Sequence, residues 1–171
     1  MGTLTQHFDR SEFNCTCCGR YGGTPADLAR LADALEAWRG RMGEMAGHEV
    51  SIPLNSAYRC PAHNLAVGGE PFSEHMAGRA VDTRPRGISL WQAVLAALEV
   101  PELSASGIGL YVNPGNPAGG WIHADVRHSG PVRWGRIILP DRSQKKVPFG
   151  EALELARSLA EDAGRLAGKD E

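Results

Sequence analysis

The sequence has 171 residues with 42% apolar and 22% charged content, which is ordinary for one soluble globular domain. Its formal net charge of −2 gives no electrostatic reason to expect nucleic acid or an anionic membrane as the partner. No apolar run is long enough to span a membrane, and the first residues lack a signal peptide's basic start and apolar stretch, so we expect synthesis in the cytoplasm. Action on a cell wall would then require release by another agent.

Turn residues and apolar spacing predict mixed helices and strands along the chain. Residues 1–23 form an irregular segment, and Thr24 and Pro25 then begin a helix that should end between Gly40 and Gly43. Further helices are expected over residues 61–67, 90–99 and 149–166, and strands over residues 50–58, 81–83, 107–112, 121–126 and 132–139.

This order predicts an α+β fold with a small antiparallel sheet flanked by helices. The segment 113–120 is rich in Gly, Pro and Asn, which favours a hairpin between the strands on either side. We expect one domain over residues 1–148 and a C-terminal helix and tail over residues 149–171.

The most informative stretch is 73–82, which holds His75 and Asp82 with Gly78 between them. Gly78 permits a sharp turn, and the apolar residues before Asp82 predict a strand that carries this carboxylate inward. A buried carboxylate needs a cation, and imidazole with carboxylate is a usual donor pair for Zn²⁺. His123 lies on another predicted strand and is the best third ligand. Three protein ligands and an open position are typical of a catalytic zinc site.

Six short motifs occur in one order along the chain. They are Ser56-Ala57-Tyr58-Arg59, Asn64 with Val67-Gly68-Gly69, Ser73-x-His75, Gly78-x-Ala80-Val81-Asp82, Gly107-Ile108-Gly109-x-Tyr111 and Ile122-His123-x-Asp125-Val126. Together they resemble peptidase family M15, the zinc D-Ala-D-Ala carboxypeptidases and murein endopeptidases, in its bacterial and phage branch. The hedgehog signalling domain shares the His-x6-Asp core and the fold.

The resemblance implies that His75, Asp82 and His123 bind one catalytic Zn²⁺. It also implies that Arg59 contacts the substrate, at a terminal carboxylate or at the scissile carbonyl oxygen. A guanidinium suits either role, because its fixed fork of donors fits carboxylate oxygens and can stabilise an oxyanion. The implied partner is the stem peptide of peptidoglycan.

The remaining cleft residues are assigned less directly. We expect Tyr58 and Trp121 to contact the substrate, and Ser73 to orient a ligand, touch the substrate or simply form a turn. Asp125 shares a strand face with His123, so it is either the general base or a residue that orients the ligand.

Many relatives carry Glu or Asp three residues before the last His, or a His two residues before it. Here Gly120 and Trp121 stand at those positions, and neither can act as a base. Asp125 is therefore our candidate catalytic base, and Glu70 and Glu74 are the alternatives.

Four cysteines, Cys15, Cys17, Cys18 and Cys60, could approach one another if the N-terminal segment folds back over the Tyr58-Arg59-Cys60 turn. A second metal, a disulfide and free buried thiols that act as small hydrophobic groups all remain open. His63 is interpreted as structural rather than as a ligand.

We expect a zinc metallopeptidase that hydrolyses a peptide bond in the peptidoglycan stem, as a D,D-carboxypeptidase or a murein endopeptidase. The alternative is a zinc-binding module of the same fold that hydrolyses nothing. A third possibility makes the cysteines the main metal site and His75 incidental. The sequence does not indicate an oligomeric state.

Overall fold

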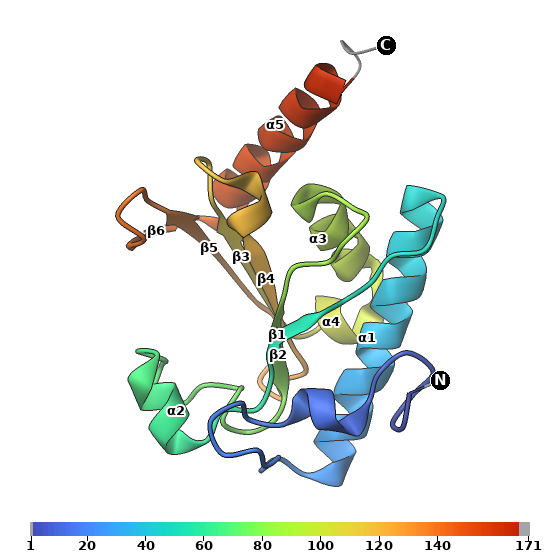
Figure 1. Cartoon of the computed structure of the whole chain (residues 1–171), viewed down its shortest axis with the longest axis vertical. Helices are drawn as coiled ribbons and strands as arrows, with labels where there is room; N and C mark the ends of the chain where they lie inside the picture. The colour runs from blue at the N-terminus through green and yellow to red at the C-terminus, as the bar shows by residue number, and fades with distance from the viewer. Residues whose placement is uncertain (1, 168–171) are drawn as a thin grey trace.

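The computed structural model describes residues 2–167 and is built on a six-stranded sheet (Figure 1). The strands are β1 (Leu54–Ser56), β2 (Ala80–Thr83), β3 (Gly107–Val112), β4 (Trp121–Asp125), β5 (Val132–Ile138) and β6 (Gln144–Val147). Their order is β1-β2-β4-β3-β5-β6, and neighbours are antiparallel except for β3 and β5. The α+β prediction is confirmed, but the sheet is larger than the expected small one.

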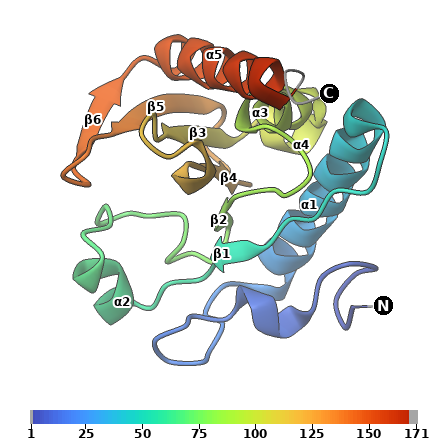
Figure 2. The same ribbon diagram turned by 45° about the horizontal axis from the view of Figure 1, so that its top comes forward.

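Helices lie on both sides of this sheet. They are η1 (Arg10–Phe13), α1 (Pro25–Ala46), α2 (Pro61–Ala66), α3 (Leu90–Glu99), α4 (Pro101–Ser104), η2 (Pro117–Gly119) and α5 (Phe149–Ala167). Figures 1 and 2 place α1 and α3 on one side and the short α2 on the other. Helix α5 packs against β3, β5 and α3. No helix within residues 2–167 combines the length and apolarity that a membrane crossing requires.

The two faces of the sheet differ in chemistry because successive side chains on a strand alternate. Val81, Ile108, Ile122 and Ala124 are fully buried and belong to the main core with α1 and α3. Asp82, His123 and Asp125 alternate with these apolar residues along β2 and β4, so their side chains lie on the opposite face. One face of the sheet therefore holds the fold together, and the other holds the candidate site.

Helix α1 begins as predicted, with the Thr24 side chain accepting a hydrogen bond from the Asp27 backbone N–H. It continues past Gly40 and Gly43 to Ala46. Each glycine costs a helix about 1 kcal/mol, but burial of Met42 between them offsets that cost. The helix ends at Gly47, whose φ of 70° is left-handed.

Two further differences concern strands. The expected strand over residues 50–58 is reduced to β1 and one isolated bridge at Ser51, since Pro53 has no N–H to donate to a ladder. Strand β6 was not predicted, because it is an exposed edge strand whose side chains show no apolar alternation.

Candidate metal centre

The site is built on one register row that crosses the sheet. Asp82 on β2 pairs with His123 on β4, and Ser56 on β1 pairs with Asp82. On the other side His123 pairs with Gly109 on β3, which pairs with Trp134 on β5. Paired residues point to the same face of a sheet, so the row brings Asp82, His123 and Trp134 together.

His75 reaches this row from the loop between α2 and β2. The loop turns at Gly78, whose φ is 72°, so the predicted sharp turn is confirmed. His75 Nδ1 lies 2.7 Å from the Ala57 carbonyl oxygen, and the Arg59 backbone N–H donates to the His75 carbonyl at 3.1 Å. These contacts fix the imidazole with Nε2 facing the row.

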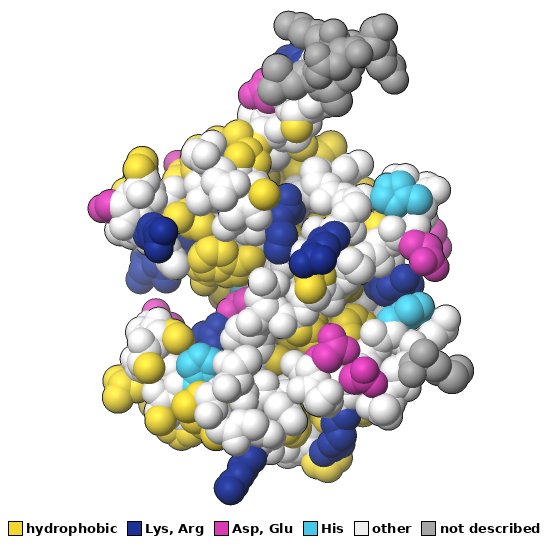
Figure 3. Space-filling model, viewed as in Figure 1, with side chains coloured by type: hydrophobic (Ala, Val, Ile, Leu, Met, Phe, Trp, Pro, Cys, Tyr) yellow, Lys and Arg dark blue, Asp and Glu magenta, His cyan; other side chains and the backbone are white. Residues whose placement is uncertain are grey.

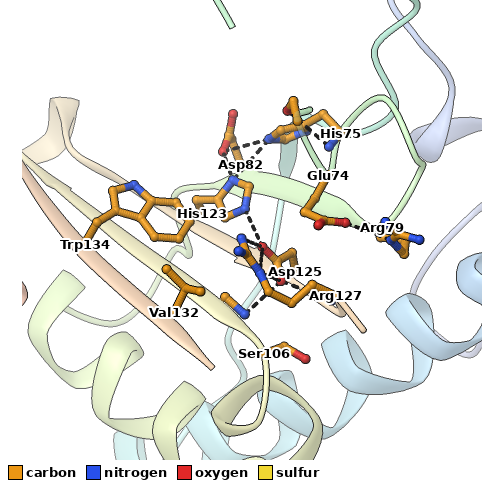
Figure 4. Close-up of polar contacts among 12 residues, drawn as sticks. Glu74, His75, Arg79, Asp82, Ser106, His123, Asp125, Arg127, Val132 and Trp134 are labelled. Carbon is orange, nitrogen blue, oxygen red and sulfur yellow. Dashed lines mark hydrogen bonds and ion pairs between the residues drawn. The ribbon is translucent and has the colours of Figure 1, made fainter. Parts of the chain in front are cut away.

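Three atoms from these residues form a nearly equilateral triangle (Figure 4). His75 Nε2 lies 3.2 Å from His123 Nδ1 and 3.2 Å from Asp82 Oδ1, and His123 Nδ1 lies 3.1 Å from Asp82 Oδ1. We call this set the metal triangle. Donors about 2.0–2.1 Å from a tetrahedral Zn²⁺ lie about 3.3 Å apart, so the triangle fits that ion with one position left for another ligand.

The hydrogen bonds around the metal triangle explain why it needs a cation. His75 Nδ1 donates to the Ala57 carbonyl, and His123 Nε2 lies 3.1 Å from Asp125 Oδ2, so in the neutral rings both triangle nitrogens carry lone pairs. Together with the Asp82 oxygen, three acceptors face one another. They repel unless a proton or a metal ion lies among them.

The electrostatics of the metal-free site agree with this picture. Burial lowers the pKa of His75, which favours its neutral, ligating form. Burial opposes charge on Asp82, but contacts with His123 and His75 outweigh it and hold the pKa of Asp82 well below its usual range. Burial also disfavours a charged His123, but its contacts with Asp125 and Asp82 raise its pKa to about 9. A proton on His123 thus takes the place that a metal ion can fill.

Asp125 supports His123 from behind the metal triangle. It is fully buried, and its carboxylate also accepts hydrogen bonds from the Gly107 backbone N–H at 2.8 Å and from Arg127 Nε at 2.9 Å. Burial raises the pKa of Asp125, but the contacts with His123 and Arg127 dominate and keep this pKa well below its usual range. An ionised Asp125 fixes the tautomer and the orientation of the His123 ring.

The metal triangle opens into a cleft of about 780 Å³. One wall comes from the loop after α2 and the other from β5 and β6, and Figure 3 shows the molecule hollowed between these two parts. Five basic side chains line the cleft; they are Arg59, Arg127, Arg133, Arg136 and Lys146. Three carboxylates also line it, from Glu70, Glu74 and Asp82, so the excess of basic groups favours a ligand that carries negative charge.

The comparisons with known proteins agree with this geometry. A family model described as Peptidase M15 matches residues 6–125, which is more than half of the chain and includes the whole metal triangle. The chain belongs to peptidase family M15. The resemblance drawn from the motifs is thereby confirmed. No curated protein matches this chain.

Within this M15 chain, three of the predicted cleft residues do line the cleft. Arg59 contacts Asp82 Oδ2, and its Nε donates to Ser56 Oγ at 2.8 Å, so it orients a triangle residue while facing the cleft. Ser73 Oγ accepts a hydrogen bond from the His75 backbone N–H at 3.3 Å. Trp121 stacks on Tyr111, with ring centroids 4.5 Å apart.

Two predicted residues lie elsewhere. Tyr58 packs against Tyr21, with ring centroids 5.8 Å apart, and is not part of the cleft lining, so its place does not support a substrate contact. Asp125 lies behind His123 and outside the lining, which corresponds to the orienting role and not to a base beside the substrate. Of the alternative acids, Glu74 pairs with Arg79 at 2.7 Å, and Glu70 is exposed at the cleft.

Sequence reasoning missed Trp134, whose ring packs against His123 with centroids 4.9 Å apart. The signal was present in the Gly107-x-Gly109 motif, because glycine inside a strand often marks the close approach of a large neighbour. A Cβ at Gly109 would lie 2.2 Å from the Trp134 ring, and one at Gly107 would lie 2.2 Å from Asp125 Oδ2. Both glycines therefore make room for groups that hold His123.

Gly109→Ala is expected to destabilise the chain by roughly 1–3 kcal/mol, because the added methyl overlaps the Trp134 ring and overpacks the sheet. Urea unfolding followed by tryptophan fluorescence measures this change. Gly40→Ala is the matched control: its Cβ meets no neighbour within 4 Å, and the substitution should stabilise α1 by about 0.5–1 kcal/mol. Equal stability of Gly109→Ala and the parent chain would contradict this packing.

Proposed function

We propose that this chain is a zinc-dependent peptidase that hydrolyses a bond in the stem peptide of peptidoglycan. The observation that carries the proposal is the metal triangle, in which two imidazole nitrogens and one carboxylate oxygen meet at the floor of a basic cleft. Zn²⁺ in that place would polarise the scissile carbonyl and activate a water molecule as the nucleophile. Membership of a peptidase family supports the reaction class.

The protein's own residues supply the other requirements of hydrolysis. His75, Asp82 and His123 would hold the ion, and Asp125 would keep His123 in its ligating tautomer. Arg59 can turn its guanidinium towards a substrate oxygen and stabilise the charge that develops there. Glu70 is the exposed carboxylate of the cleft lining and is our candidate to receive the proton of the attacking water and pass it to the leaving amine.

The charge of the cleft favours a peptide with free carboxylates. Arg127 is engaged by Asp125, and Arg133 donates to the Ser104 carbonyl at 2.6 Å. Arg136 and Lys146 face each other across β5 and β6, and neither forms an ion pair among the described residues. Like charges directly opposite each other are unfavourable, so an anionic group bound between them would relieve the repulsion. A stem peptide supplies such groups at its C-terminus and on acidic side chains.

Lys146→Glu is expected to raise KM for an acidic stem peptide roughly tenfold with little change in kcat. The substitution removes one attraction and adds one repulsion, each worth at most about 1 kcal/mol at an exposed site. Steady-state kinetics at low and high salt measure the effect, which should shrink as salt screens it. Lys145→Glu is the control, because it changes the net charge equally from outside the cleft lining. Equal KM values for the two variants would argue against an attraction between Lys146 and the carboxylates of the substrate.

The proposed function is tested with metal-free full-length chain, purified peptidoglycan and a D-Ala-D-Ala-terminated peptide. Released amino groups are counted with and without added Zn²⁺. We expect release that requires zinc and stops when a chelator is added. Bound zinc with no release from either substrate would favour the non-catalytic module, and release that a chelator does not affect would contradict the zinc mechanism.

A further inference from the structure

Three cysteine thiols converge at a place separate from the metal triangle. Cys15 and Cys18 lie on the turn that follows η1, and Cys60 stands at the N-terminus of α2. Their sulfur atoms lie within 4.8 Å of one another, although Cys60 comes 42 positions after Cys18 in the sequence. We call them the thiol group. Tetrahedral Zn–S bonds of about 2.3 Å place sulfurs about 3.8 Å apart, so these thiols are close to ligand spacing.

The turn between the first two cysteines has the backbone of a ligand loop. Two residues lie between Cys15 and Cys18, and the Gly19 backbone N–H donates to the Cys15 carbonyl at 2.8 Å. Gly19 has a φ of 68°, which a residue with a side chain rarely adopts. The Cys15 N–H donates to the Arg20 carbonyl at 2.8 Å and closes the turn. This geometry holds both thiols on the side that faces Cys60.

Backbone donors surround the sulfurs as they would surround thiolates. The Cys60 N–H points at Cys15 Sγ at 3.4 Å, and the His63 N–H points at Cys60 Sγ at 3.4 Å. A thiolate is the form that binds a metal ion.

His63 places an imidazole at the edge of the thiol group, beside Cys15. Its Nδ1 lies 3.3 Å from Cys15 Sγ, close to the edge of about 3.5 Å that a sulfur and a nitrogen share on one Zn²⁺. Cys17 and Cys18 are both exposed on the turn, but of the two it is Cys18 that belongs to the group of sulfurs within 4.8 Å of one another. A disulfide would consume two of the three thiols of the group and leave the third without a role.

We propose that Cys15, Cys18, Cys60 and His63 bind a second, structural Zn²⁺. Four protein ligands close such a site, in contrast to the open metal triangle. The ion would join the N-terminal segment to the start of α2, directly beside Arg59. This proposal makes His63 a ligand, whereas the sequence alone favoured a structural role. Cys15 and Cys18 have the Cys-x2-Cys spacing of many zinc ligands, but Cys17 lies between them and makes that spacing hard to see in the sequence.

The test titrates Co²⁺ into metal-free, reduced full-length chain. We expect an intense near-ultraviolet thiolate-to-cobalt band that saturates at one ion per chain, because the metal triangle has no sulfur ligand. The band should persist in His75→Ala and in the matched control Cys17→Ser, and it should be lost in Cys60→Ser. Absence of the band in the parent chain would overturn the proposal. A band lost in Cys17→Ser but kept in His63→Ala would overturn the assignment of His63.

A second measurement uses the parent chain, so it does not depend on whether the variants fold. In the presence of Zn²⁺, a maleimide should modify Cys17 at least tenfold faster than the other three cysteines, and a chelator should make all four reactive. Equal labelling of four thiols with and without zinc would overturn the site. Two missing thiols in chain purified without reductant, together with no zinc, would instead show a disulfide and would equally overturn it.

Discussion

His123→Ala is expected to reduce kcat/KM for a D-Ala-D-Ala peptide by roughly 10³-fold or more, which corresponds to about 4 kcal/mol of transition-state stabilisation. The substitution removes one corner of the metal triangle and leaves His75 and Asp82 as the only protein donors. Two donors do not hold Zn²⁺ against water, so the bound zinc should fall by one ion per chain. Elemental analysis of dialysed protein gives the zinc content per chain, and steady-state kinetics give kcat/KM.

The control for this variant is His48→Ala, because His48 is an exposed imidazole outside the cleft. It should keep both its zinc content and its activity. A His123→Ala chain that retains full activity would show that catalysis does not depend on the metal triangle. A His123→Ala chain that keeps its zinc content but loses activity would show that His123 is not needed to bind zinc.

Asp125→Asn is expected to lower both the stability of the chain and its affinity for zinc. The free energy of unfolding of the metal-free chain should fall by roughly 3–5 kcal/mol, because Arg127 loses its partner at a buried carboxylate. Zinc affinity should also fall roughly 10–100-fold, since His123 loses the group that fixes its tautomer. Urea unfolding without metal and zinc titration measure these changes independently.

Kinetics at saturating zinc then separate the two roles of Asp125. An orienting residue predicts that kcat approaches the parent value once the site is filled with metal. A stable, zinc-loaded Asp125→Asn chain with no turnover would instead make Asp125 the general base. Asp141→Asn serves as the stability control and should change stability by less than about 0.5 kcal/mol, because within residues 2–167 the Asp141 side chain accepts hydrogen bonds only from Ser143, on an exposed turn.

The sequence contains enough to predict the metal triangle because its residues follow local rules. Gly78 marks the turn that presents His75, and the apolar alternation around Asp82 and His123 places both on strands. The pairing of those strands could not be deduced from local pattern alone. The resemblance to family M15 implied only that the three residues meet as ligands, and the observed register of Asp82 opposite His123 explains physically how two of them do.

Other parts of the site depend on contacts that a local pattern does not encode. The sequence left both roles of Asp125 open, because the direction in which its carboxylate points depends on Arg127 and on the space at Gly107. The basic pair of Arg136 and Lys146 in the cleft was not predicted, because Lys146 lies on an exposed edge strand without apolar alternation. Tyr58 stands next to Arg59, but its ring packs on Tyr21 outside the cleft.

The most direct test of the central claim is an anomalous difference map, recorded at the zinc absorption edge from crystals of the full chain grown with Zn²⁺. The metal triangle predicts a peak about 2.0–2.2 Å from His75 Nε2, Asp82 Oδ1 and His123 Nδ1, with its remaining position open to the cleft. No peak at the triangle, or a fourth protein ligand that closes the ion's open position, would contradict the account.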